Sequence, residues 1–370
     1  SQGNAEGTDS HSDTTTDKTY VYYSFQCVSE NPLSDNFDVI EKNSRLFFLP
    51  NKFKSRPAII TLGLPEMIKT EIELMDLPSR NEIKNDMQFT GMISVGDYIF
   101  FVPCAYPAIV RVDTRDLSVT YIDKWKIEID GRIRNESEFG YFIARQYVVK
   151  GEYLYIPFLV TSAVLKLNVI SLENDILYVD TKSQGLSCIC ESVDGKFLLA
   201  GAGRNKDWIY LWDEKKVEIE KEWHVQETSD DYPVIKMLVS TCGDIYIFPW
   251  QNWGGLDVDV YKLNYYNMNL EKLDLLNDHN SCEAKPLWGD DITHAHWIDE
   301  DRILFVTGRD YKWHEYNTKT SEHVVYDILF DELDENAGMV LKEYCRTMAD
   351  YKKPIKEEVF GLKTFLNSIS

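Results

Sequence analysis

Tryptophan side chains stand beside charged and amide side chains in three stretches of the second half of the chain. The first stretch is Arg204–Trp208, the second is Trp250–Trp253, and the third is Arg309–Trp313. An indole ring offers a large, rigid apolar face, and neighbouring amide, carboxylate and guanidinium groups can orient a ligand through hydrogen bonds. This combination suits a polar ligand that also has apolar faces, such as a glycan or a peptide.

The residues that we expect to contact such a ligand come from these stretches and from one connection between them. They are Arg204, Trp208, Trp250, Asn252, Trp253, Trp288, Arg309, Asp310 and Trp313. A single loop tryptophan can serve only to pack neighbouring elements together, so it is the clustering of several that indicates a binding surface. On this interpretation the protein binds its ligand without catalysis and needs no cofactor.

Two histidines form the second candidate site. His294 and His296 lie two residues apart in a segment with strand propensity, so both side chains should point to the same side. Imidazole titrates near neutral pH and can act as a general base. With Asp291 nearby, the pair could also hold a divalent metal such as zinc. This interpretation predicts a lyase or hydrolase, and the alternative is that both histidines are hydrogen-bonded structural residues.

The elements that must position these residues form an internal repeat. An apolar strand that follows a turn residue recurs six times, at residues 44–50, 96–103, 151–157, 195–201, 243–249 and 301–308. Four copies end at a proline, which cannot donate to a strand ladder: Pro50, Pro103, Pro157 and Pro249. The next strand ends at a turn-forming residue in five copies: Asp113, Asn168, Asp213, Asn264 and Asn317.

A further strand precedes each of these pairs, and a short strand follows almost every one. Each unit therefore contains four antiparallel strands and takes roughly 50 residues. The pattern resembles the repeats of kelch, NHL, YVTN and WD-repeat propellers, with the nearest local matches at Tyr210–Asp213 and Asn317–Thr320. The resemblance covers about residues 36–328 and implies an all-β fold, a six-bladed β-propeller of four-stranded antiparallel blades. A β-sandwich with coincidental hairpins is the alternative.

The resemblance also implies where the candidate residues lie. In a propeller, the loops between the second and third strands of the blades share one face with the connections between blades. That face would carry the three tryptophan-bearing stretches side by side. The resemblance does not indicate a function, because propellers host many unrelated activities. The chain contains no P-loop, dinucleotide fingerprint, nucleophile elbow or HExxH motif, but a propeller enzyme would assemble its site from single residues on different blades.

The ends of the chain differ from the repeat. Residues 1–18 are rich in Ser, Thr, Asp and Gly, which predicts a flexible tail, and residues 19–330 would form the propeller. Within it, Thr19–Phe25 could close the ring, and the alternating charges of Asp130–Phe142 predict a solvated loop. Residues 331–370 show apolar positions at helical spacing and predict a C-terminal helical extension. Its helices would pack on the same chain or bind a protein partner.

The formal charge of −22 argues against nucleic acid as a partner, because phosphate binding needs a basic surface. No apolar run reaches the roughly 18 residues needed to span a bilayer, so membrane insertion is not expected. We expect a cytoplasmic protein, since no signal peptide is visible. The alternative is an exported or lipid-anchored protein whose signal has been removed, because the chain starts at Ser1 without methionine.

Overall fold

The computed structural model describes twelve segments of the chain. These are residues 37–42, 45–50, 58–61, 68–77, 88–133, 140–142, 146–225, 235–249, 259–276, 292–297, 299–307 and 313–326. They form six four-stranded antiparallel sheets and one helix. The predicted all-β class and the four-stranded antiparallel units are therefore confirmed.

Each sheet consists of four consecutive strands, and we number the sheets in chain order. Sheet one contains β1 (Phe37–Lys42), β2 (Arg45–Pro50), β3 (Ala58–Thr61) and β4 (Ile68–Glu71). Sheet two contains β5 (Phe89–Val95), β6 (Tyr98–Pro103), β7 (Ile109–Asp113) and β8 (Val119–Ile122). Sheet three contains β9 (Val148–Lys150), β10 (Tyr153–Pro157), β11 (Ala163–Asn168) and β12 (Asn174–Tyr178).

The second half of the chain continues the same order. Sheet four contains β13 (Gly185–Glu191), β14 (Phe197–Ala202), β15 (Trp208–Asp213) and β16 (Glu218–His224). Sheet five contains β17 (Ile235–Ser240), β18 (Asp244–Pro249), β19 (Tyr261–Asn264) and β20 (Leu270–Lys272). Sheet six contains β21 (Ile292–Trp297), β22 (Arg302–Thr307), β23 (Trp313–Asn317) and β24 (His323–Tyr326).

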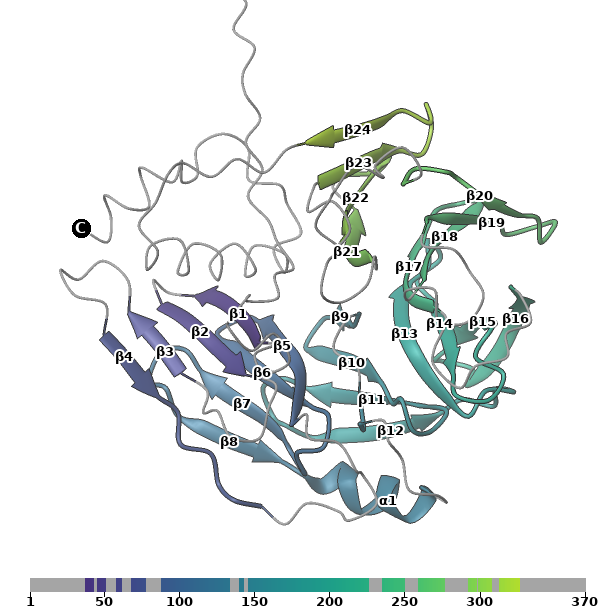
Figure 1. Cartoon of the computed structure of the whole chain (residues 1–370). Coiled ribbons are helices and arrows are strands. Elements are labelled where there is room, and N and C mark those ends of the chain that lie inside the picture. The colour runs from purple at the N-terminus through teal and green to yellow at the C-terminus, as the bar shows by residue number, and fades with distance from the viewer. Residues whose placement is uncertain are drawn as a thin grey trace, which may run out of the picture.

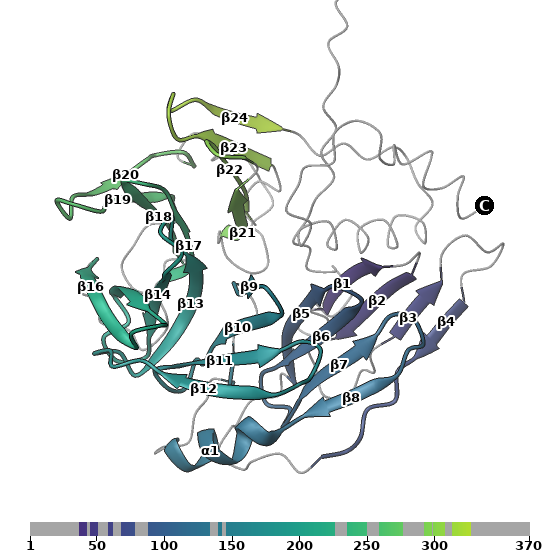
Figure 2. The ribbon, with the colours of Figure 1, turned by 180° about the vertical axis from the view of Figure 1, so that it is seen from behind.

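The sheets follow one another about a common centre, with the first strands facing the centre and the fourth strands outside (Figure 1). The view from behind gives the same order (Figure 2). Neighbouring first strands pack together, as β13 does with β17 and β1 with β5. Closure into a ring of six blades, the role of Thr19–Phe25 and the helical extension at 331–370 stay predictions, because the residues concerned lie outside the described segments.

The turn between the third and fourth strands explains the recurring Asp or Asn. In five sheets the Oδ1 atom of this residue accepts the backbone N–H two residues further on, at 2.9–3.0 Å. The residue four positions on adopts a left-handed backbone, with φ between 57° and 64°: Leu117, Leu172, Val217, Met268 and Ser321. The carboxylate or amide thus replaces a backbone acceptor within the turn, as the sequence predicted.

The described residues also contain a helix that the sequence did not predict, α1 (Lys124–Arg132). The prediction of a solvated loop at Asp130–Phe142 was wrong for residues 130–132, which are helical, and for residues 140–142, which are buried; residues 134–139 lie outside the described segments. The helix buries Trp125 and Ile129, which lie one turn apart on one helix face. Trp125 packs edge-on against Phe142, which stacks on Phe158 with ring centroids 4.4 Å apart. These rings belong to the apolar core between sheets two and three.

Gln146 links two sheets that are not neighbours in the chain. It lies just before β9, and its side-chain amide pairs with Leu238 on β17, the first strand of sheet five. Gln146 Oε1 accepts the Leu238 N–H at 3.0 Å, and Nε2 donates to the Leu238 carbonyl at 2.5 Å. Since β17 has no strand on its inner side, this amide satisfies part of an otherwise open edge.

Replacing Gln146 with alanine should lower the free energy of unfolding by about 2 kcal/mol, because the buried Leu238 amide loses both partners. Replacing it with glutamate should cost at least as much, since a carboxylate can accept the N–H but repels the carbonyl. Urea unfolding followed by tryptophan fluorescence measures both. If both variants unfold at the same urea concentration as the wild type, the Gln146 amide does not stabilise this edge.

Candidate functional site

The loop face is the end of the sheets where second strands join third strands and where each sheet connects to the next. Among the described residues of the loop face, the polar and aromatic side chains that could bind a ligand lie together on sheet four. We call this group the sheet-four rim and define it as Lys182, Arg204, Asp207, Trp208, Glu222 and His224. The rim combines the connection before β13, the loop between β14 and β15, and the end of β16.

Hydrogen bonds fix the loop between β14 and β15. Gly203 and Asn205 both adopt left-handed backbones, with φ of 67° and 55°, a conformation that Gly and Asn tolerate better than other residues. The N–H of Gln184 donates to the Arg204 carbonyl at 3.0 Å, and Asn205 Nδ2 donates to the Lys182 carbonyl at 2.9 Å. Ser183 Oγ also donates to the Asn205 carbonyl at 2.5 Å. The loop is thus anchored to the preceding connection at Arg204 itself and at the next residue, Asn205.

Asp207 and His224 form a carboxylate–imidazole pair. His224 Nε2 lies 2.5 Å from Asp207 Oδ2, and the Asp207 side chain is 10% exposed while that of His224 is 35% exposed. The N–H of Val225 donates to the Asp207 carbonyl at 2.8 Å, which holds the two strands in place. No residue within the described segments contacts the other ring nitrogen, Nδ1, by a hydrogen bond. The buried carboxylate therefore orients the ring.

The half-buried Trp208 ring packs against two polar side chains. Its centroid lies 4.9 Å from that of the His224 ring, with the planes tilted by 33°. The Lys182 ammonium lies 3.8 Å from the Trp208 ring centroid and pairs with the Glu222 carboxylate. A cation over an indole face is an attractive contact. A ligand that stacks on this side of Trp208 would have to displace Lys182.

The structure brings Arg204 and Trp208 together on one loop, and Arg204 is exposed. His294 and His296 lie on β21, the first strand of sheet six, opposite Val306 and Leu304. Trp313 begins β23. The side chains of these last three residues are not described. The other predicted site residues lie outside the described segments: Trp250, Asn252, Trp253, Trp288, Asp291, Arg309 and Asp310.

The prediction did not include His224, Asp207 or Lys182 among the site residues. His224 lies directly opposite Trp208 in the pairing of β15 with β16, so the hairpin register carries the signal. Lys182 comes from the preceding connection, and no local pattern places it over Trp208. Within the described residues, no group of three or more His, Cys, Asp or Glu side chains could hold a metal ion.

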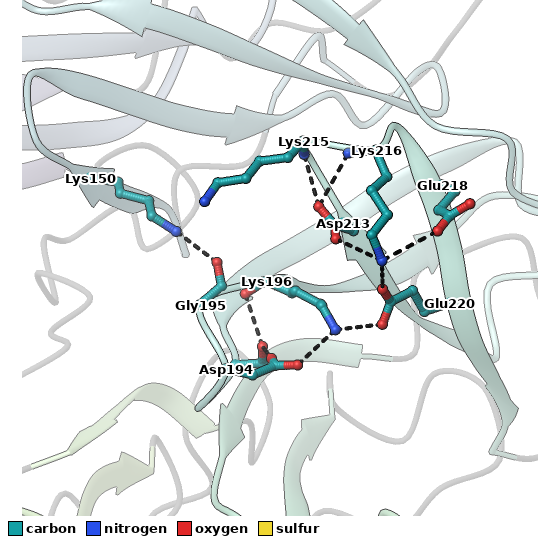
Figure 3. A network of polar contacts seen from close by, with 10 residues as sticks. Lys150, Asp194, Gly195, Lys196, Asp213, Lys215, Lys216, Glu218 and Glu220 are labelled. Carbon is teal, nitrogen blue, oxygen red and sulfur yellow. Dashed lines mark hydrogen bonds and ion pairs between the residues drawn. The ribbon is translucent and has the colours of Figure 1, made fainter.

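A second polar cluster lies on the opposite face, at the turns of sheet four (Figure 3). Lys196 contacts Asp194 at 2.9 Å and Glu220 at 2.5 Å, and Lys216 contacts Glu220 at 2.8 Å. The hydrogen bonds from Lys196 and Lys216 hold the pKa of Glu220 below its ordinary value. Because these charges neutralise one another, the cluster indicates a solvated ion-pair network rather than a ligand site.

No family model and no curated protein matches the chain. Among solved structures it is similar to virginiamycin B lyase from Staphylococcus aureus, with 10% identity and a TM-score of 0.50 over 80% of this chain and 86% of that one. It is also similar to the WD40 β-propeller domain of Doa1, with 9% identity and a TM-score of 0.46 over 80% of this chain and 82% of that domain.

An extracellular domain from B. thetaiotaomicron is similar over 85% of this chain, with 9% identity and a TM-score of 0.46, but the chain spans only 34% of that structure. At these identities the likeness shows the fold alone. Together with the six four-stranded sheets, the likeness to virginiamycin B lyase gives the chain a β-propeller fold, with no specific family indicated. No helix among the described residues has the length and apolar character needed to cross a membrane.

Proposed function

We propose that the protein is a recognition propeller, a closed ring of six blades that binds a polar ligand on the loop face of sheets four to six. The ligand would be a glycan or a peptide. The observation that carries this proposal is the anchored loop between β14 and β15, which presents Arg204 and the partly exposed Trp208 beside the Asp207–His224 pair. Groups held on a rigid scaffold lose little entropy when a ligand binds, which favours affinity.

Replacing Trp208 with alanine should weaken ligand binding at least about tenfold, because aromatic anchors contribute disproportionately to binding energy. The wild-type protein is first applied to a glycan array and to a peptide array, and the affinity of each captured ligand is then measured by calorimetry. The matched control is Tyr266→Ala. Tyr266 is 74% exposed on the turn between β19 and β20, at the opposite face, so its loss should leave binding unchanged.

Equal affinities for the wild type and Trp208→Ala would remove the sheet-four rim from the binding site. A larger loss of affinity for Tyr266→Ala than for Trp208→Ala would place the binding site on the face opposite to the one proposed. Circular dichroism of both variants keeps unfolding apart from loss of contact, since Trp208 also packs against the apolar core between sheets three and four.

A lyase or hydrolase remains the alternative hypothesis. The observation that favours it is the position of His294 and His296, two residues apart on a first strand, the strand nearest the centre of the sheets. A site beside this strand could draw residues from different sheets. Elemental analysis of the purified protein tests the metal-assisted form of this hypothesis, which a metal-free protein would exclude.

A further inference from the structure

Arg204 differs from the other described arginines in its surroundings. The guanidinium of each of the remaining five has a partner. It is a backbone carbonyl for Arg45 and Arg111, and a carboxylate for Arg115, Arg132 and Arg302. The guanidinium of Arg204 has no hydrogen-bond or ion-pair partner within the described segments, and its side chain is exposed. The chain carries 61 acidic and 39 basic residues, so an acidic partner is rarely far from a basic side chain. An unpaired arginine on an anchored loop therefore indicates a group available to an external anion.

Arginine has a planar fork of N–H donors that matches a carboxylate through two parallel hydrogen bonds. The loop that carries Arg204 is held by the bonds from Gln184, Asn205 and Ser183, so the backbone beneath the guanidinium is already ordered before a ligand binds. Less entropy is lost on binding than for an arginine on a mobile loop. The rim thus offers a preorganised site for one carboxylate.

Three residues beyond Arg204, Asp207 determines what its partner His224 can recognise. In the neutral imidazole one ring nitrogen carries the proton and the other accepts. Because the Asp207 carboxylate can only accept, it selects the tautomer with the proton on Nε2 of His224. The Nδ1 atom is then an acceptor, and it suits a ligand hydroxyl or amide donor.

We propose that the ligand of the sheet-four rim is an acidic saccharide, whose carboxylate binds Arg204 and one of whose hydroxyls donates to Nδ1 of His224. This inference rests on the proposed function and names its ligand class. A uronic acid places a carboxylate and several hydroxyls on one rigid ring, which matches a guanidinium on the anchored loop and an imidazole acceptor at the end of β16. With Lys182 displaced, the half-buried Trp208 ring would add apolar area for one face of a sugar ring. An acidic peptide supplies the carboxylate but few hydroxyl donors.

The test uses an array of galacturonate, glucuronate and mannuronate oligosaccharides, each printed beside its carboxyl-reduced counterpart. The reduced forms keep the sugar hydroxyls and lose only the charge. We expect the wild type to bind at least one acidic oligosaccharide at least tenfold more tightly than its reduced form. Arg204→Gln should lose this preference. Arg115→Gln, which alters a paired arginine on the turn between β7 and β8, should keep it.

Equal binding of acidic and reduced oligosaccharides, or a preference that survives in Arg204→Gln, would overturn the inference. Capture of peptides with no capture of any acidic oligosaccharide would also overturn it, while leaving the proposed recognition function in place. If nothing binds on either array, or if Trp208→Ala binds like the wild type, the proposed function itself fails. The two failures are therefore distinguishable.

Discussion

Replacing Asp259 with alanine is expected to lower the free energy of unfolding by about 3 kcal/mol or more. Asp259 is fully buried just before β19. Its Oδ1 atom accepts the N–H groups of Val260 at 2.7 Å and Leu275 at 3.0 Å, and Oδ2 accepts that of Leu276 at 3.4 Å. The carboxylate thereby ties the segment after β20 to the start of β19. Each buried N–H that loses its acceptor costs about 1–3 kcal/mol.

The matched variant is Asp259→Asn, which keeps one oxygen in place of Oδ1 and loses only the longest of the three bonds. We expect it to cost about 1 kcal/mol. Urea unfolding at neutral pH measures both variants. Equal losses for alanine and asparagine would show that the hydrogen bonds to Oδ1 do not stabilise the fold.

The stability difference between the wild type and Asp259→Asn should depend on pH. Burial raises the pKa of Asp259 above its ordinary value, even though three backbone N–H groups act in the opposite direction. A raised folded pKa means that a proton on Asp259 stabilises the fold. This proton-linked contribution is fully present below the ordinary pKa of 3.8 and is lost as pH rises through the raised value, whereas the contribution of the hydrogen bonds from the backbone N–H groups remains. The stability of the wild type relative to Asp259→Asn should therefore fall as pH rises through this window and stay constant above it.

Replacing Gly185 with alanine should also cost about 3 kcal/mol or more, at the high end for added volume in a packed site. Gly185 begins β13, and a Cβ atom there would overlap the backbone carbonyl of Leu159 in the loop between β10 and β11. That loop cannot easily retreat. The Leu186 N–H donates to the Phe158 carbonyl, and the Leu159 N–H donates to the Tyr141 carbonyl, both at 2.9 Å.

The control is Gly131→Ala in α1, where an added Cβ atom meets no other atom within 4 Å. Alanine is the better helix former, so this variant should gain about 0.5–1 kcal/mol. Thermal unfolding of the two variants measures the contrast. A Gly185→Ala protein as stable as the wild type would contradict the close approach of sheets three and four at the loop face.

The features that the sequence predicted are those that depend on neighbours along the chain. The turns at Asp and Asn could be predicted because the side chain binds an N–H only two residues away. The strand ends at proline could be predicted because proline lacks the N–H donor. The bond from Gln146 to Leu238 joins residues 92 positions apart, and no local pattern reports it. Helix α1 was missed because only Trp125 and Ile129 mark its buried face, which is too few to establish a helical period.

The candidate site shows the same limit. Arg204 and Trp208 were predicted because aromatic and charged residues stand together in one loop. The sequence could not show that Lys182 lies over the Trp208 ring, since this contact depends on how the connection before β13 crosses sheet four. It also could not show that Asp207 orients His224. Asp207 precedes β15 and His224 ends β16, so the two residues are far apart in the sequence although the hairpin brings them into contact.

The most direct test of the recognition surface is hydrogen–deuterium exchange with and without a ligand captured on the arrays. We predict slower exchange in residues 179–184 and 203–208 when the ligand is bound, because these two segments carry Lys182, Arg204, Asp207 and Trp208 of the sheet-four rim. The turn at residues 265–269, on the opposite face, should exchange at the same rate in both states. Protection confined to that turn, with no change in the two rim segments, would contradict the proposed site.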